Sequence, residues 1–423
     1  MFGRFHGLIG IIFILGIAFL FSNNRKRINY RLVVSGILLQ VCIGFLVLKV
    51  PFITAFFQKL GRGMQHIEQF AKQGADFVYG GIATMGNNGV PGNYAMPGMF
   101  VFAFNVVATI ILVCVLVAVM YQLGVMQRLV SVIAKGMNAI MRVSGAEALS
   151  NVASAFVGQV EAQVMIRPYL TGMTRSELLA SMTGSLACIA GGILVVYANM
   201  GERAGLDLAP KLITASLMAA PGALVISKIV FPETEESQTM GKVKLDVKKP
   251  YSNLIDAISH GAGDGMKIGI NVIAMLIGFI ALIAFLDFML LKTGHLFNPD
   301  FDLSLNYLFG KLFYPFAWSM GIPQADVANA ATLLGQKITI NEFVAFNSLT
   351  TKTVPLVTEK GLLIVSIAIC GFANFSSVGM QIGGIGELAP SRRSDLAKLG
   401  LKALLCGTMA SYLSAAIAGI LIG

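Results

Sequence analysis

The chain alternates between long stretches without acidic or basic residues and short polar segments. A helix needs about 20 predominantly apolar residues to cross a hydrocarbon core. Eight stretches meet this length, some with the help of flanking residues: about 7–22, 32–48, 99–121, 178–200, 212–227, 268–286, 361–386 and 403–423. The pattern predicts an all-α polytopic membrane protein with eight transmembrane helices.

Two glutamates lie within membrane-type sequence. Glu161 occurs in Val157-Gly-Gln-Val-Glu-Ala-Gln, and Glu342 occurs in Ile340-Asn-Glu-Phe-Val-Ala. A carboxylate at bilayer depth costs several kcal/mol, so it marks a pathway or binding site and needs a partner. An apolar segment with a break follows each glutamate after 30 residues. The breaks are at Gly191-Gly192 and at Phe372-Ala-Asn374-Phe-Ser-Ser377.

These two regions overlay at an offset of 181 residues, which brings Glu161 onto Glu342. Each acidic segment is too polar to span, and a segment that enters and returns on one side must be buried in protein. Both are therefore predicted to be re-entrant helical hairpins, the first entering from the cytoplasm and the second from outside. Such an inverted repeat is typical of secondary transporters. The alternative is chance similarity between two apolar stretches.

Two further segments separate the predicted domains. Residues 54–75 place apolar and charged residues on opposite sides at helical spacing, which predicts an interfacial amphipathic helix or, equally, a loop helix packed on protein. Residues 231–252 are polar and predict a cytosolic linker. We divide the chain into N-terminal scaffold helices with the interfacial helix, a third helix with the first repeat, the linker, and a sixth helix with the second repeat, at 1–98, 99–230, 231–252 and 253–423.

Composition and charge agree with a membrane protein. The chain is 56% hydrophobic and 12% charged, against about 25% charged in ordinary soluble domains, which excludes a soluble globule. Four basic residues, Arg25, Lys26, Arg27 and Arg31, follow the first span, and only Arg4 precedes it. The positive-inside rule then places both termini outside a cell membrane. The net charge of +10 follows this topology and predicts no nucleic-acid partner.

The cysteines and histidines indicate no cofactor, metal or catalytic site. The five cysteines, Cys42, Cys114, Cys188, Cys370 and Cys406, lie in apolar sequence without ligand spacing and are predicted to be small buried hydrophobic residues. An intramembrane enzyme would need a nucleophile with a base or a metal cluster. Paired inverted hairpins favour a transporter over a channel, and a receptor would need an output domain.

Several separated strings resemble the signature segments of the concentrative nucleoside transporters. They are Val157-Gly-Gln-Val-Glu-Ala, Arg167-Pro-Tyr, Ile189-Ala-Gly-Gly, Asn341-Glu-Phe-Val-Ala and Cys370-Gly-Phe-Ala-Asn-Phe-Ser-Ser. The resemblance extends over essentially the whole chain. It implies a homotrimer of eight-helix protomers, each with an interfacial helix, two re-entrant hairpins and its own substrate site, which moves as an elevator.

The resemblance also implies a substrate site. The residues that contact the nucleobase correspond to Gln159, Val160 and Glu161, with Ile193 beside them and Phe372 packed against the base. The residues that contact the ribose correspond to Glu342, Asn374 and Ser377. The chemistry agrees, because carboxylate, amide and hydroxyl groups bind sugar hydroxyls and an aromatic ring packs on a flat base. Asn374 and Ser377 could instead be helix-interior polar residues that bind backbone.

Departures from the family pattern bear on specificity and coupling. Val160 stands where many members have Thr, which favours purine nucleosides. The family's sodium ligands correspond to Ser154, Cys188 and the carbonyl groups of Val157 and Ile189. A thiol is a poor ligand for a hard cation. Proton symport is therefore favoured over sodium symport, with Glu161 and Glu342 as the candidate proton carriers.

Overall fold

The structure is a computed structural model that describes residues 2–79, 102–156, 158–239, 251–298 and 302–422. Val157, the linker residues 240–250 and the predicted boundary at residue 98 lie outside the described residues, as does the side chain of Glu161. Every regular element within the described ranges is helical. The prediction of an all-α protein is therefore confirmed for this part of the chain.

All eight predicted spans fall on helices. Five correspond to single helices of similar extent, which are α1 (Phe2–Leu20), α2 (Tyr30–Lys49), α5 (Phe102–Gln122), α12 (Ala209–Val230) and α20 (Arg393–Ile422). The segments at 178–200 and 361–386 are each broken in two, into α10 (Arg175–Ala187) with α11 (Gly191–Arg203) and α18 (Glu359–Ile369) with α19 (Phe375–Leu388). The breaks lie at 188–190 and 370–374, so the first is directly before the predicted Gly191-Gly192, which begins α11, and the second overlaps the predicted 372–377.

The eighth span, predicted at 268–286, lies within a much longer helix, α13 (Leu254–Phe297). Within this helix, the stretch Ile280–Phe297 is long and apolar enough to cross a membrane, and it overlaps the C-terminal part of the predicted span. Tyr30–Lys49, Ala209–Val230 and Pro390–Ile422 meet the same criterion among the described residues. The helix extends beyond the apolar stretch because charged residues without proline do not end a helix.

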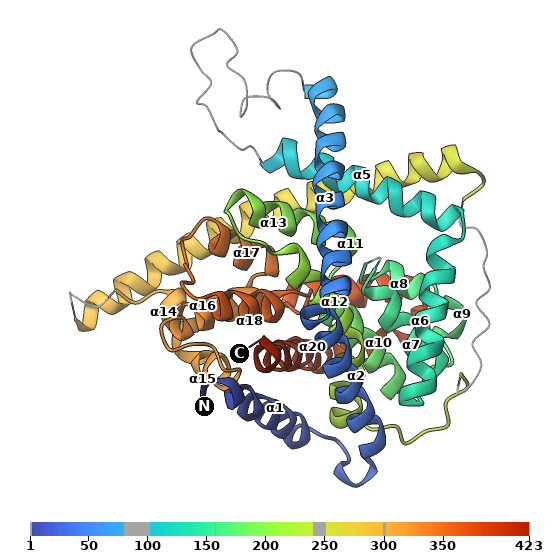
Figure 1. Ribbon diagram of the computed structural model, residues 1–423, viewed down its shortest axis with the longest axis horizontal. Helices are drawn as coiled ribbons and strands as arrows, with labels where there is room; N and C mark the ends of the chain where they lie inside the picture. The colour runs from blue at the N-terminus through green and yellow to red at the C-terminus, as the bar shows by residue number, and fades with distance from the viewer. Residues whose placement is uncertain (1, 80–101, 157, 240–250, 299–301, 423) are drawn as a thin grey trace.

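The remaining helices surround this set. The amphipathic segment at 54–75 is helical, within α3 (Pro51–Tyr79), and its position at the membrane interface stays a prediction. The sequence reasoning did not predict α6 (Val125–Met141), α14 (Leu305–Leu312) or α15 (Tyr314–Ser319). In Figure 1, α5 and α13 lie side by side along one margin of the molecule, and α20 runs through its middle against α10, α12 and α18.

The two glutamate segments each consist of consecutive short helices. The first contains α7 (Gly145–Ser154), α8 (Glu161–Val164) and α9 (Arg167–Leu170). The second contains α16 (Val327–Thr339) and α17 (Glu342–Thr350). Glu161 is the first residue of α8 and Glu342 is the first residue of α17. The glutamates that overlay in the sequence therefore begin corresponding elements.

Each glutamate segment starts and ends at one place. In the first, the Gly145 amide donates to the Thr239 carbonyl (3.0 Å), while Gly172 packs against the neighbouring Gln238 side chain. In the second, Asp326 before α16 accepts hydrogen bonds from the amides of Val357 (2.8 Å) and Thr358 (3.0 Å) before α18. These contacts bring the two ends of each segment together, as the predicted hairpins require, and re-entry into a membrane stays a prediction.

The cysteine prediction holds in part. Cys188, Cys370 and Cys406 are buried, and Cys114 is half-buried. The prediction is wrong for Cys42, which is exposed on α2. This helix also exposes Leu38 and Phe45. A helix that faces lipid presents an apolar surface outward, so apolar sequence around a cysteine does not imply burial there.

Candidate functional site

The two interrupted helices meet at their breaks. The Phe372 amide donates a hydrogen bond to the Cys188 carbonyl (3.3 Å), which joins the second break to the first. Gly371 has φ +124°, and a Cβ atom at this position would collide with the carbonyl oxygen of Ala187. Only glycine combines this backbone conformation with so close an approach. The two breaks are thereby held in direct backbone contact.

Glu342 lies next to this crossing and is buried. The Asn341 side chain caps α17 by accepting from the Val344 amide (2.9 Å), so Glu342 occupies the first turn, at the positive end of the helix. Tyr197 donates its hydroxyl proton to Oε1 of Glu342 (3.2 Å), and Asn374 Nδ2 donates to Oε2 (2.8 Å). Neutral donors from α11 and from the start of α19 thus hold each oxygen of the carboxylate.

Asn374 has two roles in this arrangement. Its Oδ1 atom caps α19 by accepting from the Ser377 amide (2.8 Å), and it also accepts from the Ser376 hydroxyl (2.8 Å). Its Nδ2 atom faces Glu342. The backbone role that the sequence left open is therefore present, and the amide group still reaches the candidate site. Ser377 is buried beside it in the first turn of α19.

Sequence reasoning missed Tyr197. Its ring stacks on Phe346 (centroids 4.5 Å apart) and lies 5.9 Å from the ring of Phe343, which fixes α11 against α17. Tyr197 is one helical turn beyond Ile193, which was predicted to lie beside the substrate. That i, i+4 spacing places both residues on one face of the helix and could have identified it.

The first hairpin also contacts α19, which begins beside Asn374. Val160 packs against Gly384 of α19, where an added Cβ atom would lie 2.6 Å from its Cγ1 atom. Gln159 Nε2 lies 3.8 Å from the sulfur of Met380, also on α19. Among the contacts described, these residues reach α19 and not Glu342 itself. Ile193 and Phe372 are partly buried and pack on the core.

Ser154, one of the positions predicted to correspond to sodium ligands, is engaged in hydrogen bonds within the protein. The Ser154 hydroxyl contacts the Ser150 carbonyl (2.7 Å) and the Ser185 hydroxyl (2.9 Å). Gln163 donates to Ser185 (2.8 Å) and accepts from Ser181 (2.6 Å). This series of side-chain hydrogen bonds thus runs from α7 to α10. It holds the first hairpin against the interrupted helix.

The Cys188 thiol also faces a protein group. Its sulfur lies 3.9 Å from the carbonyl oxygen of Asn151, and both residues are buried. Ile189 is buried next to it, and Val157 lies outside the described residues. The two described side chains at positions predicted to correspond to sodium ligands are a hydroxyl and a thiol, and a hard cation prefers oxygen to sulfur.

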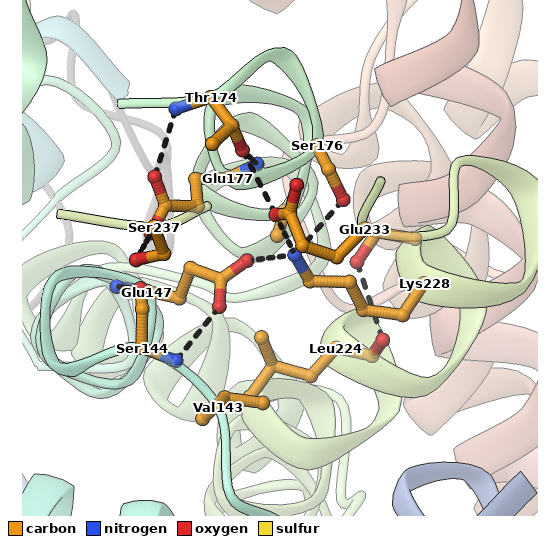
Figure 2. Close-up of polar contacts among 12 residues, drawn as sticks. Val143, Ser144, Glu147, Thr174, Ser176, Glu177, Leu224, Lys228, Glu233 and Ser237 are labelled. Carbon is orange, nitrogen blue, oxygen red and sulfur yellow. Dashed lines mark hydrogen bonds and ion pairs between the residues drawn. The ribbon is translucent and has the colours of Figure 1, made fainter. Parts of the chain in front are cut away.

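A second polar cluster, which the sequence reasoning did not identify, lies at the base of the first hairpin (Figure 2). The Lys228 ammonium pairs with Glu147 and with Glu233 Oε2 (3.1 Å), and it donates to the Ser176 hydroxyl (2.9 Å). Glu147 belongs to α7, Ser176 to α10 and Glu233 to the predicted linker. The cluster therefore joins three segments of the chain around one buried lysine.

Two helix starts complete this cluster. Ser144 with Glu147 and Thr174 with Glu177 form capping boxes for α7 and α10. The Ser237 hydroxyl of the linker donates to Glu177. Residues 231–239 are consequently folded against the hairpin base.

Comparisons with known proteins identify the family. A model described as "Na+ dependent nucleoside transporter N-terminus" matches residues 9–82, and the corresponding C-terminal model matches residues 211–419. A "Nucleoside recognition" model matches residues 103–204. The nucleoside permease NupC of Helicobacter pylori is 36% identical over 100% of this chain and 99% of its own. The chain belongs to the concentrative nucleoside transporter family.

Other members of the concentrative nucleoside transporter family match along the same length. The uncharacterized transporter YutK of Bacillus subtilis is 39% identical over 98% of this chain and 99% of its own. The sodium/nucleoside cotransporter 1 of Rattus norvegicus is 36% identical, with 97% of this chain matched to 63% of that protein. These relatives are transporters, so the prediction that the chain is not an enzyme is confirmed.

Solved structures of one family member, CNTnw, share the fold. The inward-facing substrate-bound structure aligns with TM-score 0.90 and 38% identity, covering 100% of this chain and 98% of CNTnw. An outward-facing structure of a variant aligns with TM-score 0.89, covering 99% and 98%. The prediction that the chain has the concentrative nucleoside transporter fold is therefore confirmed.

Proposed function

We propose that the chain is a secondary active transporter that takes up nucleosides by cation symport, with an elevator-type alternating-access mechanism. The observation that carries the proposal is the buried Glu342 carboxylate, hydrogen-bonded to Asn374 where two interrupted helices cross. Sugar hydroxyls are strong donors to a carboxylate, and an amide can both donate and accept. A neutral ligand with adjacent hydroxyl groups suits this pair.

The base-binding part of the proposal rests on the first hairpin and the breaks. In this proposal Phe372 offers an aromatic face, Gln159 approaches the base from the turn before α8 and Ile193 from α11, and the role of Glu161 rests on the family resemblance. The apolar contact of Val160 with Gly384 supports a site without the extra hydroxyl that Thr would supply. We propose a preference for purine nucleosides on this basis.

Proton coupling is the favoured form of the symport. The Ser154 hydroxyl is already hydrogen-bonded within the protein, and Cys188 supplies a thiol, which supports the loss of a sodium site. Glu161 or Glu342 would carry the proton. One charge moved through 100 mV yields about 2.3 kcal/mol, enough for roughly fifty-fold accumulation. Sodium symport, which the family models name, is the alternative.

The topology and assembly proposed from the sequence have partial structural support. Gly7 of α1 packs on Ile420 of α20, so the two ends of the chain lie at one end of this helix pair, as outside termini require. Residues along α13, including Ile270, Ile277 and Phe285, expose large apolar side chains. Such a surface fits lipid or the neighbouring protomers of the proposed homotrimer.

Uptake by proteoliposomes tests this function. Purified protein is reconstituted, and accumulation of labelled inosine and uridine is measured under an imposed proton gradient or an imposed sodium gradient, with the membrane potential clamped in both. We expect protons to drive the accumulation. We also expect inosine to compete for uptake more strongly than uridine does. Accumulation that requires sodium and ignores the proton gradient would contradict proton coupling, and no accumulation under either gradient would contradict the transporter proposal.

A further inference from the structure

The first hairpin carries a fully buried glutamine that the substrate-site proposal does not use. Gln163 lies on α8, two residues beyond Glu161, and is 0% exposed. Both polar atoms of its side chain have partners on α10, since Oε1 accepts from the Ser181 hydroxyl (2.6 Å) and Nε2 donates to the Ser185 hydroxyl (2.8 Å). A buried amide that lost these hydrogen bonds would be costly. The side chain is therefore held in one place.

The two serines give this glutamine a two-point attachment. Ser181 and Ser185 are four residues apart on α10, so they lie on one face of that helix, about one turn from each other. A side chain that is bound to two successive turns cannot slide along the helix or rotate without breaking a hydrogen bond. Because α8 has only four residues, fixing Gln163 fixes the whole short helix.

The other arm of the hairpin uses the same anchor. The Ser185 hydroxyl also contacts the hydroxyl of Ser154, the last residue of α7 (2.9 Å), and both serines are buried. α7 and α8 are therefore fastened to one place on α10. The turn that carries Gln159 and Val160 joins these two anchored helices.

This turn contacts α19, which has its own attachment to α10. Val160 packs against Gly384 of α19, where an added Cβ atom would lie 2.6 Å from the valine. Gln381 of α19 donates through Nε2 to the Met182 carbonyl of α10 (3.3 Å). The hairpin and α19 are thus joined to the same helix through different side chains. The approach of the turn to α19 consequently depends on Gln163.

We propose that Gln163 is a positioning residue that sets the distance between this turn and α19, and thereby the selectivity for the nucleobase. The inference rests on the proposed function, in which Gln159 and Val160 contact the base and Asn374 contacts the ribose. Gln163 does not touch the nucleoside in this account. Its effect is specific to the base, because the contact between Asn374 and Glu342 joins the starts of α19 and α17 without the first hairpin.

A glutamine that only stabilises the fold would behave differently. Its loss would lower stability and weaken every ligand by the same factor, whereas loss of a positioning residue weakens a purine and a pyrimidine nucleoside by different factors. Gln40 is the matched comparison, because it is also 0% exposed. Its Nε2 atom donates to the Met218 carbonyl and to the Ser414 hydroxyl (2.9 Å each), which joins α2 to α12 and α20.

The first experiment measures equilibrium binding of labelled inosine and labelled uridine to wild type, Gln163→Met and Gln40→Met. Methionine keeps the approximate length of glutamine without its polar atoms. We expect the inosine-to-uridine ratio of Kd values to change by roughly two- to tenfold in Gln163→Met, as for one weakened neutral hydrogen bond to the base. The ratio should keep its wild-type value in Gln40→Met. An unchanged ratio in Gln163→Met, or an equal change in both variants, would overturn the proposal.

The second experiment tests the anchor itself. A double-mutant cycle combines Gln163→Met with Ser181→Ala, and thermal unfolding midpoints are measured in detergent. We expect the double variant to lose less than the sum of the single losses, because both substitutions remove the same hydrogen bond. The control cycle pairs Gln163→Met with Ser414→Ala and should be additive, since Ser414 is a partner of Gln40. Additive losses in the Ser181 cycle would overturn the anchor.

Failure of this inference differs from failure of the proposed function. Wild-type protein that binds neither nucleoside would refute the proposed function and this inference with it. Nucleoside binding by the wild type, with an unchanged ratio in Gln163→Met, would overturn the inference alone. Where Gln163→Met does not fold, Ser181→Ala removes one of the two hydrogen bonds and takes its place in the binding experiment, with the same expected change in ratio and the same contradicting result.

Discussion

Two buried lysines of this transporter differ in what surrounds them. Lys228, 5% exposed, contacts two carboxylates and a hydroxyl at the base of the first hairpin. Lys337, 0% exposed, has no hydrogen-bond partner among the described residues. The first lysine is held by direct ion pairs, and the second has no such contact within the described part of the chain.

The difference distinguishes a buried lysine that ties segments of the fold together from one that makes no such contact. The Lys228 cluster ties together α7, α10 and residues of the linker, so its members have reason to move as one body (Figure 2). Lys337 makes no such tie within the described part of the chain. We expect substitution of Lys228 to lower stability more than substitution of Lys337, because Lys228 makes ion pairs and Lys337 makes none within the described part of the chain.

The largest expected effect is that of Lys228→Met. Removing the ammonium leaves the Glu147 carboxylate buried without a cation, which typically costs about 3–5 kcal/mol of stability. The measurement is the denaturation midpoint of the purified protein, with Lys337→Met as the matched variant. A smaller loss of stability at Lys228 than at Lys337 would reverse the comparison.

A medium effect is expected for Glu147→Gln. Lys228 keeps Glu233 and Ser176 as partners, so the loss is about 1–3 kcal/mol, the usual cost of weakening one charge-assisted contact. Thermal unfolding measures the loss, and nucleoside uptake per folded molecule should remain at the wild-type level. Strongly reduced uptake by a stable variant would mean that the Lys228 cluster takes part in transport.

The smallest effect is expected for Tyr197→Phe. The change removes one neutral donor to Glu342, worth about 0.5–1.5 kcal/mol, and keeps the ring stacked on Phe346. The KM for nucleoside should rise by several-fold, up to about tenfold. Tyr412→Phe is the control, because the buried Tyr412 hydroxyl has no partner among the described residues. Equal KM changes in the two variants would remove Tyr197 from the site.

Hydropathy and the positions of helix-interrupting residues were enough to predict much of the fold. Apolar length located every predicted span on a helix, and the glycine and polar residues at 191–192 and 372–377 located both breaks to within a few residues, because those residue types interrupt helices. Apolar length did not give the extent of α13, since a helix can continue into water on polar residues. The exposed Cys42 shows that apolar sequence cannot distinguish lipid contact from burial.

Residues of the candidate site were predictable only where their residue type is unusual for the surrounding sequence. Glu342 and Asn374 stand out in apolar sequence, and the structure joins them. Lys337 is equally unusual there, and the rule that identified the glutamates, that a buried charge needs a partner, would have identified it. The Lys228 cluster could not be foreseen, because its partners come from three segments that only the folded chain brings together.

The most direct test of the central claim is equilibrium binding of a labelled nucleoside to purified wild-type protein and to Glu342→Gln. Charge-assisted hydrogen bonds to a carboxylate contribute about 1.5–3 kcal/mol each, so we predict a loss of affinity of roughly ten- to hundred-fold in the variant. The Glu147→Gln variant, which alters a carboxylate at the hairpin base, should bind as wild type does. Unchanged affinity in Glu342→Gln would contradict the account, since it would place the nucleoside somewhere other than the crossing of the two interrupted helices.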